Sequence, residues 1–415
     1  MLHTPWKIRC TCFLLLLTVV LTSGCVGNQK QQSTQNFPLT RSNVSIESTE
    51  TPPSIEPADG NPNAKRILFD NTHGQTAGMA DWVINGAFSD FANALSQAGY
   101  FIKELRTAPI TYDHLKEYDV FVVPEANIPY KKSEQDAMLR YVQNGGGIFF
   151  ISDHYNADRN LNRWDANEVF NGYRRGAWDD PTKGMFPDEK NSSAMQGVES
   201  NNWLGKYFGI RFRYNALGDL MATNIVPPNQ TFGITEGVGS VSVHAGSTLA
   251  ILDPTKAKGI VYVPRTNRKW SHAVDKGVYK GGGIEEGPFA AIAKIESGKA
   301  AFIGDSSAVE DSSPLYNHEK TGREKTTHDG FQEADNRIVL INMVNWLAKK
   351  ESYTSFDQLS NISLDSPTPL IIDGREDERP ESSIEPQSEP WDPQGVYTWW
   401  DPSTFADGSY KQGIR

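Results

Sequence analysis

The chain contains 415 residues, and 40 Lys and Arg against 51 Asp and Glu give it a formal net charge of −11. At about 150 residues per domain, this length accommodates two or three domains, or one large α/β domain with tails. The acidic balance argues against a protein that captures nucleic acid over a broad basic surface.

Residues 1–24 have the pattern of an export signal. Lys7 and Arg9 supply a positive start, and an apolar run follows over residues 12–21. This run is shorter than the roughly 20 apolar residues that span a bilayer, so it predicts a signal peptide. The signal ends in Leu-Thr-Ser-Gly before Cys25, which resembles a bacterial lipoprotein box. The resemblance implies lipidation of Cys25, with palmitate among the acyl chains, and a lipid-anchored protein on the extracytoplasmic face of a cell membrane. The alternative is an ordinary secretory signal that leaves Cys25 free.

The number of cysteines excludes several chemistries. The chain has only Cys10, Cys12 and Cys25, and removal of the signal leaves Cys25 alone. A lipidated Cys25 leaves no thiol for disulfides, cysteine–zinc sites or a cysteine nucleophile in the rest of the chain.

Two polar segments flank the central part of the chain. Residues 25–63 are rich in Gln, Ser, Thr, Asn and Pro, and this composition predicts a flexible tether. Residues 351–415 combine an acidic, Pro-rich run with an aromatic end. That aromatic end could hold a partner or a glycan, but we expect it to pack back onto the domain.

The central residues 64–350 alternate strand and helix patterns. Apolar runs predict strands at residues 66–69, 100–105, 120–123 and 148–151. Apolar residues at helical spacing predict a first helix through Ile84, Phe88, Phe91 and Leu95 that ends at Gly99. A capping-box pattern at Ser133 predicts a second helix through Val142. This β-α-β-β-α-β order predicts an α/β fold: a flavodoxin-like, open, mainly parallel sheet with helices on both faces.

Residues 155–285 lose this alternation, so we expect a large loop- and strand-rich insertion there. Extra strands are expected near residues 249–252 and 260–263. Strands at 289–295 and 300–303, joined by a Ser297-Gly298 hairpin, and a helix at 338–347 then complete the domain. The three glycines at 145–147 end a helix and precede a strand, so they form a helix C-cap rather than a phosphate-binding loop.

Polar residues follow three of the predicted strands. These candidates for a catalytic site are Asp70 and His73, Asp153 and His154, and Asp305 and Ser306. Ligands of open parallel sheets bind beyond the carboxyl ends of the strands, so we expect these side chains to converge on one pocket. The alternative is that each Asp or Ser only caps the following helix or turn.

The residue types of this pocket suit two hydrolytic chemistries. Asp70, His73, Asp153 and His154 are candidate ligands of a divalent metal, which could activate water, although their spacing matches no metal motif. We expect no other cofactor. A serine hydrolase could use Ser306 or Ser307 with His73, His154 or His328, but no Gly-x-Ser-x-Gly turn is present, so we expect Ser306 to be a helix N-cap.

Residues 158–165 mix Arg, Asn and Asp with Trp164. Either this segment lines the pocket and recognises a sugar, nucleotide or peptide, or Trp164 packs beneath the insertion.

Asp70, the run Gly145-Gly146-Gly147 with its strand, Gly304-Asp305-Ser306 and Asn345-Trp346-Leu347 resemble the class I glutamine-amidotransferase-like superfamily. The similar branches are the non-catalytic domains of gliding-motility ABC-transporter auxiliary proteins and of intraflagellar-transport proteins. The resemblance covers residues 64–155 and 288–350. Enzymes of the superfamily carry a cysteine after the strand at 148–151, where this chain reads Ser152-Asp153-His154. The resemblance thus implies a domain without cysteine-dependent glutaminase activity.

We therefore expect a membrane-anchored lipoprotein whose domain binds a small molecule, a glycan or a protein partner, with no nucleic acid. The alternative is a metal-dependent hydrolase that uses the Asp/His cluster at the carboxyl ends of the strands.

Overall fold

The computed structural model describes residues 51–155, 157, 163–271, 273–319, 321–370 and 398–401. The predicted signal peptide and Cys25 lie outside the described residues, as do most of the predicted tether and most of the acidic tail. In the part of the chain that is described, no helix is long and apolar enough to cross a membrane.

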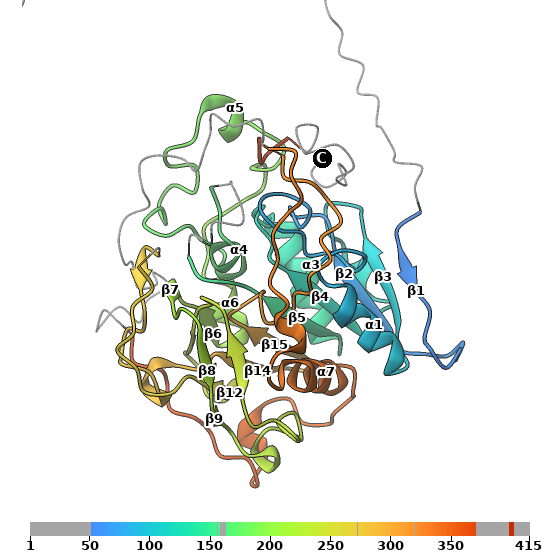
Figure 1. The fold of residues 1–415 in the computed structure, drawn as a ribbon, viewed down its shortest axis with the longest axis vertical. Coiled ribbons are helices and arrows are strands. Elements are labelled where there is room, and N and C mark those ends of the chain that lie inside the picture. The colour runs from blue at the N-terminus through green and yellow to red at the C-terminus, as the bar shows by residue number, and fades with distance from the viewer. Residues whose placement is uncertain are drawn as a thin grey trace, which may run out of the picture. The chain divides into compact units, whose positions relative to one another are not determined.

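The fold is organised around one large mixed sheet (Figure 1). Nine strands of the described residues form it, in the order β1 (Ser54–Ile55), β3 (Phe101–Leu105), β2 (Arg66–Asp70), β4 (Val120–Pro124), β5 (Gly147–Ile151), β15 (Gly298–Ile303), β14 (Ala290–Ile295), β12 (Ala257–Tyr262) and β9 (Asn224–Ile225). The five neighbours from β3 to β15 run parallel. Strands β1, β14, β12 and β9 pair antiparallel with their neighbours. The predicted fold class, a mainly parallel α/β sheet, is confirmed.

Helices cover both faces of this sheet because its strands alternate their side chains. In β2, Ile67 and Phe69 belong to one apolar cluster, whereas Leu68 belongs to another. The first cluster includes apolar residues of α1 (Ser89–Gln97) and α7 (Asn336–Leu347). The second includes residues of α3 (Lys132–Gln143) and α6 (Trp203–Phe208). Each fully buried Phe or Leu in these clusters contributes about 1.5–3 kcal/mol through removal from water.

Shorter elements fill the region of the predicted insertion. Three two-stranded sheets of the described residues pair β10 with β8, β11 with β6 and β13 with β7. Their bounds are β6 (Ile210–Phe212), β7 (Asn215–Ala216), β8 (Leu220–Ala222), β10 (Val241–Val243), β11 (Leu249–Ile251) and β13 (Asp275–Lys276). The remaining helices are α2 (Tyr112–Leu115), α4 (Ala166–Asn171), α5 (Pro187–Lys190), and the 3₁₀ turns η1 (Pro228–Gln230), η2 (Ile284–Glu286), η3 (Gly330–Gln332) and η4 (Phe356–Gln358).

Three features of the fold differ from the sequence expectation: an extra strand, the start of a helix and the place of a strand in the sheet. Ser54 and Ile55 lie in the predicted tether but form β1, which pairs with β3 at one end of the sheet. Helix α1 begins only at Ser89. Ile84 and Phe88 precede it in buried turns, where backbone amides bond to nearby carbonyl groups, as Phe88 N does to Val83 O at 3.2 Å. Strand β12 was expected in an insertion but is part of the main sheet.

The predicted tail also contacts the domain within its described residues. Thr368 N donates to Ile251 O at 2.8 Å, and Asp365 Oδ1 pairs with Lys258 Nζ at 2.9 Å. Trp399 is 3% exposed and its Nε1 donates to Glu189 Oε1 at 2.8 Å. The domain therefore extends past residue 350, and Trp399 packs back onto it as expected.

Candidate functional site

An acidic residue lies at the carboxyl end of each of the five parallel strands. These residues are Glu104 at β3, Asp70 at β2, Glu125 after β4, Asp153 after β5 and Asp305 after β15, and all are buried. The five strands are consecutive neighbours, so their ends lie along one side of the sheet, which we call the carboxyl edge. This is the side where open parallel sheets bind ligands.

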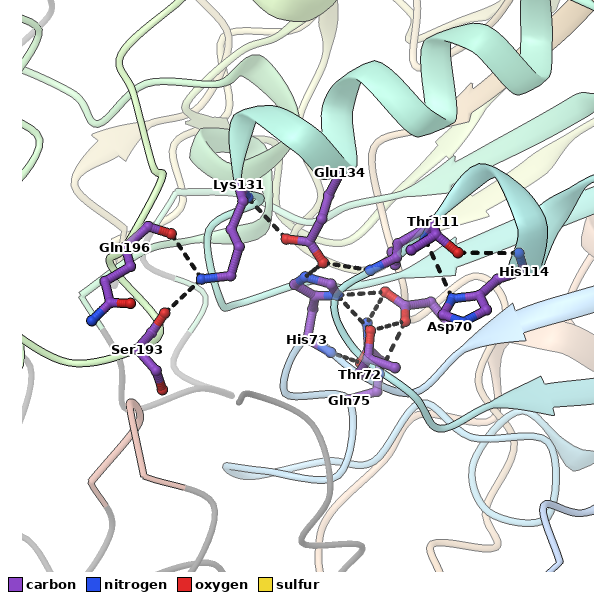
Figure 2. A network of polar contacts seen from close by, with 11 residues as sticks. Asp70, Thr72, His73, Gln75, Thr111, His114, Lys131, Glu134, Ser193 and Gln196 are labelled. Atoms are coloured by element: carbon purple, nitrogen blue, oxygen red, sulfur yellow. Dashed lines mark hydrogen bonds and ion pairs between the residues drawn. The ribbon is translucent and has the colours of Figure 1, made fainter. Parts of the chain in front are cut away.

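The first group of polar residues at the carboxyl edge centres on His73 (Figure 2). Its Nδ1 lies 3.0 Å from Asp70 Oδ2 and 2.7 Å from Thr72 Oγ1. The Thr72 hydroxyl donates to Asp70 Oδ1 at 2.6 Å, and Gln75 Nε2 donates to Asp70 Oδ2 at 3.3 Å. This turn after β2 is thus held by side-chain hydrogen bonds within six residues of sequence.

Helix α3 contributes the second carboxylate to His73. Glu134 Oε1 lies 3.3 Å from His73 Nε2, and it also accepts from Ile110 N at 2.8 Å. The other oxygen, Oε2, accepts from Lys131 N at 2.9 Å and so caps α3. The N-cap of this helix is therefore Lys131, two residues before the predicted Ser133, and Glu134 supplies the capping acceptor. The Tyr130 ring lies 4.5 Å from the His73 ring.

The two carboxylates keep His73 protonated. Burial alone would lower its pKa, but the charges of Glu134 and Asp70 and their hydrogen bonds outweigh burial and raise the pKa from 6.5 to about 10. Burial would raise the pKa of Glu134, yet the facing imidazolium lowers it. At neutral pH, His73 is therefore a fixed cation between two anions rather than a base that can take up a proton.

The second group centres on Asp153 and Asp305. These residues follow adjacent parallel strands that are paired at Ile151 and Ile303. Burial and the charge of Asp153 raise the pKa of Asp305 well above its usual value, although Asp305 accepts from His244 N at 2.6 Å and Ser307 N at 3.0 Å. The raised pKa favours the protonated form of Asp305, so this pair of carboxyl groups can both donate and accept hydrogen bonds.

Residues beside Asp305 extend this group. Ser306 Oγ donates to Glu310 Oε1 at 3.3 Å, and Trp82 Nε1 donates to the same oxygen at 2.9 Å. The imidazole of His244 lies 2.8 Å from Glu333 Oε2 and stacks on the His328 ring at 5.0 Å. These aromatic and acidic side chains surround the end of β15.

The prediction for Ser306 is corrected by this geometry. The hydrogen bonds and ion pairs of Asp70 and His73 involve Thr72, Gln75 and Glu134, and Asp153 and Asp305 follow strands β5 and β15 at the same carboxyl edge. Ser306 was expected to N-cap a helix, but its carbonyl accepts from Val309 N and Glu310 N in an isolated turn. Its hydroxyl contacts a carboxylate, so it is not arranged as a serine nucleophile beside an imidazole.

The predicted metal ligands are not arranged around one point. Among the described residues, no group of three or more His, Cys, Asp or Glu side chains is placed to hold a metal ion. The candidates Asp70, His73, Asp153 and His154 thus do not form one centre, since the two nitrogens of His73 already face Asp70 and Glu134. The Nδ1 of His154 lies 2.9 Å from the carbonyl oxygen of Tyr155.

Residues 158–162 of the proposed recognition segment lie outside the described residues. The described part favours packing over recognition. Trp164 is buried in the apolar cluster of α3, and Arg163 pairs with Glu189, the residue that also holds Trp399.

Sequence reasoning missed Glu125 and Glu134. Glu125 directly follows β4 and lies two residues after the predicted strand at 120–123, so the rule that strand ends carry site residues would have found it. It has a φ of +31°, a left-handed conformation that costs a residue with a Cβ about 1 kcal/mol. Glu134 gives no such signal, because its contact with His73 depends on tertiary packing.

Comparison with protein-family models and with curated proteins finds no match. Similar solved structures include the N-terminal domain of mmIFT52, with 13% identity and a TM-score of 0.43 over 69% of this chain and 99% of that one. A ThuA-like protein from Bacteroides uniformis is 15% identical, with a TM-score of 0.38 over 69% of this chain and 91% of that one. A cytoplasmic protein from Salmonella typhimurium is 11% identical, with a TM-score of 0.39 over 69% of this chain and 100% of that one. At these values the likenesses carry no argument about chemistry, and the fold class rests on the sheet itself.

Proposed function

We propose that this chain is an extracytoplasmic lipoprotein, anchored to a membrane through Cys25, whose α/β domain binds a ligand or partner at the carboxyl edge. The domain is proposed to act without a cysteine nucleophile, as a binding module similar to the non-catalytic branches of the amidotransferase-like superfamily. Its ligand is proposed to be a small molecule, a glycan or a protein segment.

The observation that carries the proposal is the turn after β5. This strand lies at the centre of the sheet, between β4 and β15, and leads into Ser152-Asp153-His154. Cysteine-dependent transfer needs a thiolate at such a turn. The cysteines of the whole sequence are Cys10, Cys12 and Cys25, all in its first 25 residues.

The state of the side chains at this edge supports binding over nucleophilic chemistry. His73 is held protonated between Asp70 and Glu134, and Ser306 donates to Glu310. Asp153 and Asp305 supply buried acceptors beside each other. Buried carboxylates that do not serve a nucleophile suit recognition of ligand donors.

The anchor rests on the pattern of residues 1–25. A positive start, a short apolar run and a small-residue stretch before Cys25 support export and acylation. Several acyl chains on one residue exceed the two signals that stable membrane attachment requires.

The anchor is tested by Cys25→Ser in the full chain, with Cys12→Ser as the matched control. We expect the wild type and the control to incorporate labelled palmitate and to sediment with membranes, and Cys25→Ser to do neither. Membrane attachment of Cys25→Ser equal to wild type would overturn the anchoring proposal.

Binding without hydrolysis is tested on the purified full chain with phosphoester, glycoside and carboxylic ester substrates, with and without zinc, manganese or calcium. We expect no turnover under any of these conditions. Turnover that requires a metal and is lost in Asp153→Ala would overturn the binding proposal in favour of a metal-dependent hydrolase.

A further inference from the structure

A buried arginine packs against two tyrosine rings that also contact each other, one of them from Tyr155 in the turn after β5. The side chain of Arg175 is 1% exposed. Its guanidinium carbon lies 4.6 Å from the ring centroid of Tyr155 and 5.3 Å from that of Tyr214. The two rings meet edge to face at 5.5 Å. Planar guanidinium groups stack favourably on aromatic faces, so this arrangement fixes the orientation of Arg175.

Most of the donors of Arg175 are left open. Its Nη2 donates to Asp275 Oδ1 at 2.6 Å, whereas Nε and Nη1 are buried and have no hydrogen-bond partner among the described residues. The Nε of the adjacent Arg174 is also buried without a partner in this part of the chain. Buried donors of a charged group are costly to leave unsatisfied, and each such group calls for an explanation.

These donors lie close to the turn that follows β5 at the carboxyl edge. Tyr155 directly follows Asp153 and His154 in the turn after β5. Arg174 and Arg175 both interact electrostatically with Tyr155. Tyr155, Tyr173 and Tyr214 form a small buried cluster, which we call the tyrosine cluster. Trp178 and Val274 are partly exposed and pack on it, so they mark its side toward solvent.

We propose that Arg175, together with Arg174 and Tyr155, binds the oxyanion group of a small ligand, either a carboxylate or a phosphate. Nη1 and the second hydrogen of Nη2 form the end-on edge of the guanidinium, and carboxylate and phosphate oxygens match this edge. Asp275 holds the other side of the group in place. This inference rests on the proposed binding function and names the chemical class of its ligand.

The structure offers a matched control in Arg211. This arginine is also buried, at 5% exposed, and its Nη1 has no partner among the described residues. Its Nε donates to Asn202 Oδ1 at 3.1 Å from strand β6. Arg211 therefore carries the same kind of open donor on a different element, strand β6.

Binding is measured by calorimetry on the full chain in detergent, with acetate, inorganic phosphate, glucuronate, glucose 6-phosphate and neutral glucose. We expect wild type and Arg211→Gln to bind at least one oxyanion and not glucose. Arg175→Gln should bind it about 10- to 100-fold more weakly, the range expected for a lost charge-assisted hydrogen bond. Arg175→Lys keeps the charge beside Asp275 and should weaken binding about tenfold, which covers the case that the Gln variant does not fold.

Binding of acetate or glucuronate would identify a carboxylate as the ligand group, and binding of inorganic phosphate or glucose 6-phosphate would identify a phosphate. Absence of oxyanion binding by wild type, or equal binding by wild type and a folded Arg175 variant, would overturn the inference. Membrane attachment through Cys25 and the lack of turnover are measured separately, so the proposed function can stand when the oxyanion inference fails.

Discussion

The imidazole Nε2 of His73 lies 3.3 Å from Oε1 of Glu134, which connects the turn after β2 to the first turn of α3. On its other side, His73 Nδ1 lies 3.0 Å from Asp70 Oδ2. The three side chains are buried, so their charges are not screened by water as surface pairs are. The fold thus depends on one cation that is shared by two carboxylates.

Glu134→Gln is expected to lower the free energy of unfolding by about 3 kcal/mol, because it leaves the buried imidazolium of His73 with one anion. It also disturbs the hydrogen bonds that Glu134 accepts from the backbone amides of Ile110 and Lys131. Urea denaturation measures this change. The control is Asp136→Asn, which removes the exposed pair with Lys132 and should change stability by no more than about 0.5 kcal/mol. Equal effects of the two variants would contradict a special role of Glu134.

Stability is expected to fall as the pH rises above neutrality. The pKa of His73 is 6.5 in its ordinary state and about 10 in the fold, so the folded protein binds this proton more tightly. Its contribution is complete below pH 6.5 and is lost as the pH rises toward 10. Urea denaturation at a series of pH values measures the slope, and His73→Gln should flatten it. A slope unchanged in that variant would show that other groups cause it.

Asp153→Asn is expected to lower the pKa of Asp305. The charge of Asp153 is one of two main causes that raise this pKa, and burial is the larger one. The pKa of Asp305 should therefore fall in the variant but stay above 3.8. NMR titration of the carboxyl carbons measures it, with Asp113→Asn on the surface as the control. A pKa of Asp305 equal in wild type and Asp153→Asn would refute electrostatic coupling of the pair.

Gly246→Ala is expected to destabilise the end of β15. An added Cβ would lie 2.5 Å from both Asp305 Cβ and Gly304 O, so the backbone would have to move. We expect a loss of about 3 kcal/mol, the upper part of the range for overpacked sites. Gly322→Ala is the control, because its φ of +66° gives a cost of about 1 kcal/mol although nothing lies within 4 Å. Thermal unfolding compares the two variants, and a smaller effect at Gly246 would contradict this packing.

Trp399→Ala is expected to cost about 3–5 kcal/mol of stability, because it removes a buried indole next to the Arg163–Glu189 pair. Trp399→Phe keeps most of the ring and loses only the donor to Glu189, so about 1 kcal/mol is expected. Chemical denaturation of both variants measures the difference. If Trp399→Ala unfolds at the same denaturant concentration as wild type, this part of the tail does not stabilise the domain.

Much of the sheet could be predicted from the sequence because its strands are apolar on both faces and end in polar residues. The runs at β2, β4 and β5 are of this kind, and each was placed within a residue or two. Strands β1 and β9 could not be found, since two residues carry no periodic pattern. Helix α1 was predicted to begin too early because Ile84 and Phe88 continue the helical spacing in a buried turn.

The candidate site was predicted only in part. Asp70, Asp153 and Asp305 could be placed at one edge because strand order and direction follow from the β-α-β pattern. The contact between His73 and Glu134 depends on how helices and loops pack, and so does the packing of Arg175 against Tyr155 and Tyr214. Residues far apart in an irregular stretch give no local signal of such contacts.

The outermost strands β1 and β9 have two residues each among those described. A long free strand edge presents a row of unpaired backbone groups that can template pairing with another molecule. Here the five- and six-residue strands β3 and β12 are partly covered by these short neighbours. Two residues of each inner strand are paired in this way, and the Asp365 carboxylate also accepts from Gly259 N of β12, so fewer backbone groups at these edges remain available for pairing with a second copy.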